Sequence, residues 1–309
     1  MSALICGSYA YDTIMVFHDQ FKNHILPDKV HMLNVSFLVP DMRREFGGCA
    51  GNIAFTLHML GGKAEPMGTV GNDFAPYAAW MDKNGQSRKY LKEVDSYTGQ
   101  AFITTDMDDN QITAFHPGAM GFSHENKVSD APEATIGIVS PDGRDGMIEH
   151  AAQFVEQDVP FIFDPGQGLP MFGGEELSTF VDQATWVTVN DYEGEMLAER
   201  TGKSLEDIAK QVKALVVTRG GEGSDIYVDG KVIKIPLAKI SEAKDPTGCG
   251  DAFRGGLLYG MMNGMDWETS GRIASLCGAI KIEQLGPQNH SFTMDEFKAR
   301  YKENFGSEF

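Results

Sequence analysis

The sequence contains little cysteine, few basic residues and no long apolar run. Its 4 cysteines among 309 residues form no CxxC pair, so we expect reduced thiols and no disulfide framework. The 26 Lys and Arg residues stand against 44 Asp and Glu residues, a formal net charge of -18, which excludes a general nucleic-acid binder. No apolar run approaches the roughly 18–20 residues of a membrane span, and the first residues lack the features of a signal peptide. We therefore expect an acidic globular protein of the cytoplasm that binds neither nucleic acids nor membranes.

Three sequence motifs are also missing, and each absence excludes a class of site. The 8 histidines have no HExxH-like spacing, so a dedicated transition-metal site is not expected. No GxxxxGK(S/T) segment occurs, which excludes the P-loop nucleotide folds. The glycines after the first apolar run lack the spacing of a dinucleotide fingerprint. An anionic ligand is still compatible with the acidic composition, because backbone amides bind phosphate without any net positive charge.

Short apolar runs alternate with amphipathic segments along most of the chain. This alternation predicts an α/β protein built from parallel βαβ units with right-handed crossovers. The predicted strands are Ala3–Cys6, Thr135–Val139, Pro160–Phe163, Thr185–Val189, Leu215–Thr218 and Asp225–Val228. The predicted helices are Cys49–Leu60, Asp73–Lys83, Gly143–Glu156, Tyr192–Arg200, Leu205–Lys213, Gly255–Gly264, Glu268–Glu283 and Met294–Tyr301.

Two regions, residues 12–39 and 98–117, interrupt this alternation. Each contains a pair of strand-like runs, which are Thr13–Phe17, Leu33–Val39, Gln100–Thr105 and Gln111–Phe115. Four such strands predict one small antiparallel sheet, which is too small to be stable alone. We expect it to cover an active site on the main domain, which then consists of residues 1–11, 40–97 and 118–309.

The strongest motif is DPTGCGD, from Asp245 to Asp251, followed by the helix-like AFRGGLLYGMM. Its glycines allow backbone torsions that other residues avoid, so the amides of Gly248, Cys249 and Gly250 are expected to face outward at a helix N-terminus and bind an anion. Asp251 stands at the mouth of this anion hole. It is either a helix cap or a base that takes the proton of a hydroxyl attacking a phosphoryl group.

Three further motifs each fit two interpretations. The segment GGCAGN, Gly47–Asn52, is either a ligand-binding turn or a glycine turn with an Asn cap. Asn190 and Glu193 follow a predicted strand. They are either an N-cap with an acidic first turn or oxygen ligands of Mg²⁺, which usually binds through water. The segment TRGGEGS, Thr218–Ser224, is a hairpin turn or a loop that rests against a nucleotide phosphate.

In this order, the motifs resemble those of the PfkB (ribokinase-like) family of sugar and nucleoside kinases. Gly47, Gly48 and Asn52, with Ala54, Gly61 and Gly71, are similar to its N-terminal signature, and DPTGCGD with Gly255 is similar to its C-terminal one. Asn190 and Glu193 match its NxxE motif, and VGND at Val70–Asp73 resembles another recurrent element. The resemblance spans nearly the whole chain. It implies a ribokinase-like three-layer α/β/α core with a mostly parallel central sheet and a small β-sheet lid.

The resemblance also implies a role for each motif. Asp251 would be the catalytic base, and Gly248, Cys249 and Gly250 would bind the transferring phosphate. Asn190 and Glu193 would order Mg²⁺ and its waters on ATP. The substrate hydroxyls would be held by Asp12, Gly48 and Asn52. The ATP site would be lined by Asn190, Thr218, Gly221, Gly223 and part of Cys277–His290. A monovalent cation such as K⁺ often lies beside the anion hole in this family, here near the carbonyls of Asp245 and Thr247.

Two positions depart from the family pattern. Cys249 stands where the family usually has Ala or another small residue, which puts a thiol that is open to oxidation beside the anion hole. The segment DPGQG, Asp164–Gly168, lacks an Arg that often helps to hold phosphate. The basic residues that would compensate are Arg144, Arg219 or Arg254.

The substrate is expected from the lid and from local resemblance. Phe102 and Phe115 alternate with small or polar residues and would present rings on which a purine base stacks. Alternatively, they form the lid's own core or a contact between two lids, so the protein is a monomer or a homodimer through the lid. Thr98–Asp106, Asn110–Met120 and Gly286–His290 look like bacterial adenosine kinases. This resemblance implies phosphorylation of adenosine on its 5′-hydroxyl, giving AMP and ADP. A sugar kinase acting on ribose and a nucleoside sensor without catalysis are the alternatives.

Overall fold

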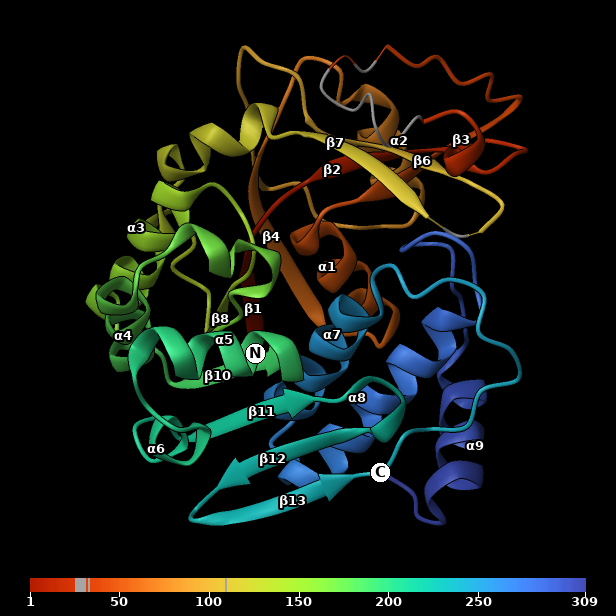
Figure 1. The fold of residues 1–309 in the computed structure, drawn as a ribbon. Coiled ribbons are helices and arrows are strands. Elements are labelled where there is room, and N and C mark those ends of the chain that lie inside the picture. The colour runs from red at the N-terminus through yellow and green to blue at the C-terminus, as the bar shows by residue number, and fades with distance from the viewer. Residues whose placement is uncertain (26–31, 33, 109) are drawn as a thin grey trace.

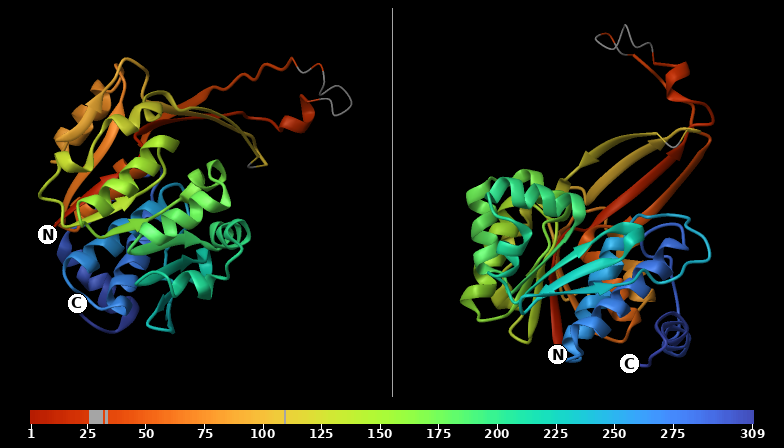
Figure 2. Two further views of the ribbon diagram at one scale, coloured as in Figure 1. Left: turned by 90° about the vertical axis from the view of Figure 1, so that its left-hand side faces the viewer. Right: turned by 60° about the horizontal axis from the view of Figure 1, so that its bottom comes forward.

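The computed structural model describes residues 1–25, 32, 34–108 and 110–309. They form a three-layer core from which a second, smaller sheet projects (Figures 1 and 2). The expected ribokinase-like α/β core with a β-sheet lid is thereby confirmed. Within these ranges, no helix combines the length and the apolar character that crossing a membrane requires.

The core is organised around a 9-stranded sheet with the order β13-β12-β11-β10-β9-β8-β1-β4-β5. The strands from β11 to β5 in this order are parallel, and β12 pairs antiparallel with both β11 and β13, so β12 alone runs against the direction of the sheet. Ligands of such open sheets bind beyond the carboxyl ends of the strands. The strands are β1 Ser2–Cys6, β4 Lys63–Val70, β5 Tyr90–Glu93, β8 Ile136–Val139, β9 Phe161–Phe163, β10 Trp186–Asn190, β11 Ala214–Thr218, β12 Ser224–Val228 and β13 Lys231–Ile235.

Helices cover both faces of this sheet (Figure 1). In β1, Ala3 and Ile5 pack into the cluster on one face and Leu4 and Cys6 into the cluster on the other, as the two-residue period of a strand requires. One face carries α1 Cys49–Met59, α2 Ala75–Lys83, α7 Cys249–Met262 and α8 Trp267–Ile282, with α9 Met294–Phe305 packed on α8. The other face carries α3 Arg144–Glu156, α4 Gly174–Gln183, α5 Asp191–Thr201 and α6 Leu205–Ala209.

The lid is a 4-stranded sheet with the order β3-β2-β6-β7. Its strands are β2 Ala10–Val16, β3 Asp41–Gly47, β6 Gly99–Thr105 and β7 Gln111–His116. The pairs β2–β3 and β6–β7 are antiparallel, whereas β2 and β6 run parallel, so the expected fully antiparallel sheet is wrong. In Figure 2 the lid extends from the core as an arm.

One predicted lid strand is wrong, and a boundary moves with it. Leu33 lies outside the described residues, and residues 34–39 form no strand. The fourth lid strand is instead β3, Asp41–Gly47, which the sequence analysis assigned to the core. Its sequence DMRREFG is mostly charged and partly exposed, so it lacks the apolar alternation that would have indicated a strand. The lid therefore takes residues 41–47 from the core.

Candidate active site

The turn from Asp245 to Asp251 leads directly into α7. Gly248 precedes the helix with φ 80°, and a Cβ at this residue would lie 2.7 Å from Cβ of Pro287. Both the torsion and the space therefore require glycine. The amides of Gly248 and Gly250 have no acceptor inside the helix, because the first N–H groups of a helix lack one. These two N–H groups are therefore left without an intrahelical partner, as the expected anion site requires.

Cys249 departs from the expectation for this turn. Its amide donates to the carbonyl of Pro246 at 3.1 Å, so it closes the turn and does not face a ligand. Burial raises the pKa of the Cys249 thiol to about 11, which keeps the thiol protonated and makes it a poor nucleophile. The other three cysteines are buried and free, as expected.

Asp251 lies in the first turn of α7 but does not cap it. Its carboxylate accepts a hydrogen bond of 2.8 Å from Nδ2 of Asn52, and the N-cap residue is Gly248. Burial raises the pKa of Asp251 to about 6, and the negative charge of Asp164 adds to this rise. The hydrogen bond from Asn52 and the positive charge of Arg254 oppose it. The group is thus mainly ionised at neutral pH, with a pKa close to that of an efficient general base.

Asn52 is no helix cap either, because it lies inside α1, which begins at Cys49. Its Oδ1 accepts a hydrogen bond of 3.0 Å from Nε2 of Gln288, which is buried in the loop after α8. Gln288 in turn accepts at Oε1 from the indole N–H of Trp80, at 3.3 Å. Since an indole nitrogen only donates, this contact fixes which way the Gln288 amide points.

A second contact fixes the same direction. The hydroxyl of Tyr77 donates to the carbonyl of Gly47 at 2.9 Å, so its oxygen accepts from Nε2 of Gln288. Gln288 must therefore donate toward Asn52, and Asn52 must donate toward Asp251. We call this chain, from Trp80 and Tyr77 through Gln288 and Asn52 to Asp251, the base relay. Because it ends in a donor, it favours the carboxylate form of Asp251.

Of the three candidate basic residues, Arg254 is the one that lies near Asp251. Its guanidinium binds both carboxylate oxygens of Asp164, at 3.1 and 2.9 Å, and lies 4.0 Å from Glu193. It lines a cavity of about 390 Å³ together with Asp251. The other two candidates lie in ion pairs elsewhere, Arg144 with Glu176 and Arg219 with Asp225.

Asn190 and Glu193 form a capping box at the start of α5. Oδ1 of Asn190 accepts from the amide of Glu193 at 2.7 Å, and Oε2 of Glu193 accepts from the amide of Asn190 at 2.8 Å. Both also line the cavity with Asp251. Among the described residues, no group of three or more His, Cys, Asp or Glu side chains could hold a metal. Mg²⁺ in this place would therefore depend on phosphate oxygens and waters for most of its ligands, as is usual for this ion.

The segment Thr218–Ser224 joins the antiparallel strands β11 and β12, so the hairpin interpretation is confirmed. Thr218, Gly221 and Gly223 also line a mostly apolar cavity of about 310 Å³ on the other side of the Asp245–Asp251 turn. The remaining walls come from the loop after β13 and from α7 and α8, and include Leu237, Ile240, Phe253, Ser275, Gly278, Ala279 and Ile282. Leu237 and Ile240 lie in no motif, so no sequence pattern indicated that they line this cavity.

The lid presents Asp12 and Phe115 on the same face. Strand register pairs Asp12 with Glu45 and with Ala101, and pairs Ala101 with Phe115. A Cβ on Gly47 would lie 2.5 Å from Oδ2 of Asp12, so this face reaches the glycine turn before α1. Burial, with the negative charges of Glu45 and Asp245, raises the pKa of Asp12 to about 6.

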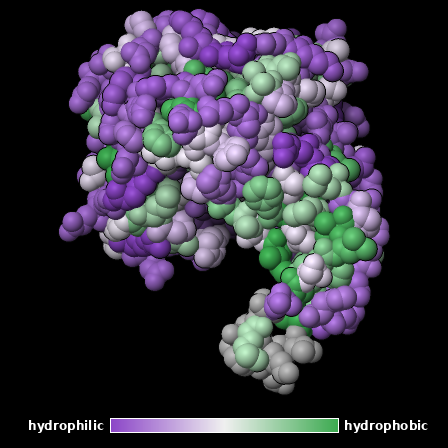
Figure 3. Space-filling view, turned by 90° about the horizontal axis from the view of Figure 1, so that it is seen from above, coloured by the Kyte–Doolittle hydropathy of each residue, from purple (hydrophilic) through white to green (hydrophobic). Residues whose placement is uncertain are grey.

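Phe102 lies on the opposite face of the lid. It is paired with Thr13 and Ala114, one position out of step with Asp12 and Phe115, so the expectation that both rings face the pocket is wrong. A strand points successive side chains to opposite sides. Met42 and Ile112 share the face of Phe102 by register. In Figure 3, apolar side chains gather on this projecting part of the molecule.

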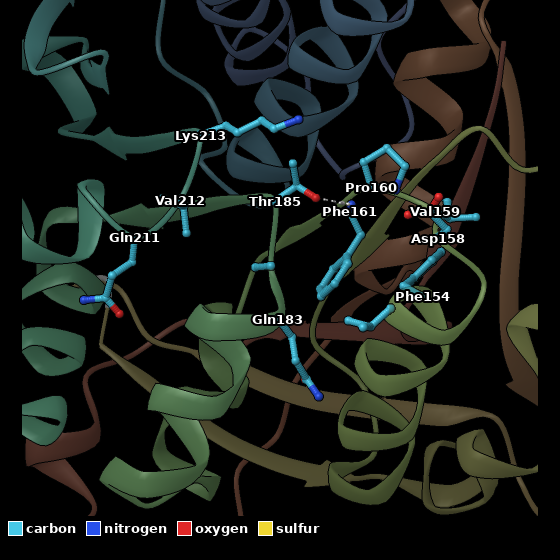
Figure 4. A pocket seen from close by; sticks show the side chains of 12 residues that line it. Phe154, Asp158, Val159, Pro160, Phe161, Gln183, Thr185, Gln211, Val212 and Lys213 are labelled. Atoms are coloured by element: carbon cyan, nitrogen blue, oxygen red, sulfur yellow. Dashed lines mark hydrogen bonds between the residues drawn. The ribbon is translucent and has the colours of Figure 1, made fainter.

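A cavity more voluminous than either of those at the Asp245–Asp251 turn, about 490 Å³, lies elsewhere (Figure 4). Its walls come from the ends of α3 and α4 and from the loops that precede β9, β10 and β11, and include Phe154, Asp158, Gln183, Thr185 and Lys213. It is therefore at the amino ends of parallel strands, opposite the edge where such sheets bind ligands. It contains no residue of the motifs, so we place the candidate active site at the turn before α7.

Comparison with known proteins decides the family. A model described as the pfkB family of carbohydrate kinases matches residues 11–294. The chain belongs to the pfkB family. A structure of Burkholderia thailandensis nucleoside kinase in complex with inosine superposes with a TM-score of 0.91, at 51% identity over 99% of both chains. A nucleoside kinase of Methanocaldococcus jannaschii is 31% identical over 282 residues, 88% of this chain and 90% of that protein. Adenosine kinase of Saccharomyces cerevisiae is 27% identical over 81% of each chain.

Proposed function

We propose that this pfkB-family protein is an ATP-dependent nucleoside kinase that phosphorylates the 5′-hydroxyl of purine nucleosides, adenosine among them. The observation that carries the proposal is the similarity, over 99% of both chains, to a nucleoside kinase that was solved with inosine. A related structure of the same Burkholderia enzyme contains ADP and inosine together. The carboxylate of Asp251, hydrogen-bonded by the base relay, would supply the base that such a transfer needs. The amides of Gly248 and Gly250 would supply the anion site.

Asp251 is proposed as the general base. The 5′-oxygen of the nucleoside attacks the γ-phosphorus of ATP, the hydroxyl proton passes to Asp251, and ADP leaves with the electrons of the broken P–O bond. The amides of Gly248 and Gly250 then stabilise negative charge on the oxygens of the transferring group. A pKa of about 6 keeps Asp251 ionised before the reaction and still able to hold a proton during it.

ATP is proposed to lie along the two cavities that share Thr218 and Gly250. The apolar cavity would bind the adenine ring of ATP, and the phosphates of ATP would reach the anion hole. Arg254, in the same cavity as Asp251, would then supply the positive charge that the DPGQG segment lacks. Asn190 and Glu193 would hold Mg²⁺ through water, and the ion would neutralise charge on the phosphates.

The nucleoside is proposed to bind between the lid and α1. Asp12 and Asn52 would hold ribose hydroxyls, beside the backbone of Gly48, where a Cβ would lie 2.5 Å from the carbonyl oxygen of Ser8. Phe115, on the Asp12 face and 53% exposed, would stack on the base. Adenosine and inosine differ only at position 6 of the purine, so a stacking ring accepts both.

Substrate-dependent release of ADP tests this proposal. Purified protein with MgATP is assayed with adenosine, inosine, ribose and fructose, and the product is identified by phosphorus NMR. We expect turnover with the two nucleosides, little with the free sugars, and a 5′-monophosphate as product. The control is 5′-deoxyadenosine, which lacks the nucleophile and should inhibit without being consumed. Faster turnover of ribose would make the protein a sugar kinase, and binding of nucleosides without turnover would make it a sensor.

A further inference from the structure

The side chain of Lys281 is fully buried behind the anion hole. Lys281 lies in the last turn of α8 and is 0% exposed. Its Nζ donates to the carbonyl oxygen of Asp245 at 2.6 Å and to that of Gln284 at 3.3 Å. It also lies 4.0 Å from Oδ1 of Asp245. A buried ammonium is costly unless it is paired and hydrogen-bonded, and here it is both.

Asp245 joins the anion-hole turn to the segment after α8. Its amide donates to the carbonyl of Ile282 at 3.1 Å. Its carboxylate accepts from the amide of Thr247 at 2.9 Å and from the amide of Gly286 at 2.9 Å. Together with the Lys281 ammonium, these contacts of Asp245 form a junction between the turn and the segment after α8. This junction limits where the turn, and with it Gly248 and Gly250, can lie. The junction lies only a few residues from the outward amides.

This arrangement does not fit the monovalent cation that the family resemblance implies. The carbonyl of Asp245, which the sequence analysis named as a candidate ligand, is already bound by Nζ of Lys281. A second cation on the same oxygen would lie beside a buried ammonium, where like charges repel strongly because little water screens them. The other expected ligand, a carbonyl near Thr247, would then have to hold the ion without the Asp245 carbonyl.

We infer that Lys281 is a built-in cation that takes the place of a bound monovalent ion behind the anion hole, so that this protein works without K⁺. The ammonium supplies the same positive charge to the Asp245 carbonyl, but it is tethered to α8 and cannot exchange with solvent. The inference rests on the proposed kinase function for its effect on turnover. The site itself follows from the contacts of Lys281 alone.

The first experiment measures wild-type turnover in KCl, NaCl and choline chloride at equal ionic strength, with freshly dialysed protein and nucleotide. We expect rates that agree within about twofold in all three salts, because the positive charge is part of the chain. Activation by K⁺ of about fivefold or more over choline would overturn the inference. This experiment needs no variant, so it stands even where a substitution prevents folding.

The second experiment removes the ammonium with Lys281→Ala and Lys281→Met. We expect turnover in choline chloride to fall by about tenfold or more, and K⁺ to recover part of it only in Lys281→Ala, which leaves room for an ion. Lys244→Met, next to the same turn but exposed, is the matched control and should behave as wild type. Full activity of Lys281→Met in choline would contradict the inference.

A third measurement is independent of turnover. Thermal unfolding of Lys281→Ala, followed in KCl and in choline chloride without nucleotide, should show a higher Tm in KCl, because a bound ion stabilises the folded state. Wild type should show the same Tm in both salts. If no nucleoside is phosphorylated by wild type in any salt, the proposed function fails, and this Tm difference still decides the inference. Equal Tm values for Lys281→Ala in both salts would count against it.

Discussion

The anion-hole turn and the lid sheet, which are proposed to contribute to one site, are held in place in different ways. Around the turn, buried polar groups make directional contacts that leave one geometry. Gly248 adopts a torsion only glycine favours, and Asn52, Gln288 and Lys281 are at most 5% exposed. The lid is held mainly by strand pairing, and several of its large side chains are exposed, among them Phe115 at 53%. In the proposed mechanism, the buried turn carries out the chemistry and the exposed lid selects the substrate.

The largest expected effect comes from breaking the buried ion pair in the rigid part. Arg254→Met leaves the carboxylate of Asp164, 3% exposed, without its bidentate partner. Removing one member of such a pair costs about 3–5 kcal/mol of folding free energy. Urea unfolding followed by circular dichroism measures this loss.

The double variant Arg254→Met with Asp164→Leu is the control for that prediction. It removes both charges, so it should recover most of the lost stability, although not the activity. A double variant as unstable as the single one would show that packing, and not the uncompensated charge, is responsible.

The base relay is expected to have the next largest effect. Gln288→Leu frees the amide of Asn52 to turn its oxygen toward Asp251, which favours the protonated carboxyl and raises its pKa further. We expect kcat/KM at pH 7 to fall by about tenfold and to recover at higher pH. The groups around Asp251 that also influence its pKa are Asp164, Arg254 and Cys49, and this variant leaves all of them in place.

Gln183→Leu is the matched control for the relay. The same substitution is made in a residue that lines the distant cavity of Figure 4, so the pH profile of this variant should be that of wild type. If Gln288→Leu lowers activity equally at every pH, the relay has only a structural role.

The pH profile of the wild type is expected to follow from two carboxyl groups whose pKa is raised and which are proposed to act directly on the nucleoside. Asp251 and Asp12 both have a pKa of about 6, and both are proposed to act as carboxylates. Activity should therefore be full above pH 7 and should fall as pH drops through about 6. With both groups needed, the fall in log kcat/KM should approach two per pH unit, and in Asp12→Asn it should approach one. A profile flat down to pH 5 would contradict this account.

The smallest expected effect separates the two faces of the lid. Phe115→Ala removes a ring on the Asp12 face, so KM for inosine should rise by roughly five- to tenfold, the equivalent of about 1 kcal/mol of stacking. Phe102→Ala removes a ring of the same size on the other face and should leave KM unchanged. Steady-state kinetics of the two variants, with adenosine and inosine, measures the difference. Equal effects of the two substitutions would remove the stacking argument.

The sequence predicted the rigid part well because its motifs are local. DPTGCGD determines a turn and a helix start within seven consecutive residues, and the alternating apolar runs predicted most strands of the parallel sheet. The strand β4 was missed, because its sequence KAEPMGTV contains a proline and a glycine that argue against a strand. Pro66 is nevertheless accommodated next to Ile5 of β1.

Contacts between distant segments could not be predicted in the same way. Gln288 meets Asn52 across 236 positions of the chain, and Lys281 meets Asp245 across 36. Neither residue has a local pattern that distinguishes it from a surface polar side chain. The side of the lid sheet on which Phe102 lies could not be predicted either, because it depends on strand register. A shift of one residue moves every side chain of a strand to the other face.

Asp251 is the point at which the account is tested most directly. Asp251→Asn keeps the size of the side chain and removes the base, so turnover of inosine with MgATP should fall by about 10²–10⁴-fold. Inosine binding, measured by calorimetry on the same preparation, should stay close to that of wild type. Turnover within a few-fold of wild type would contradict the assignment of the base, and with it the proposed mechanism.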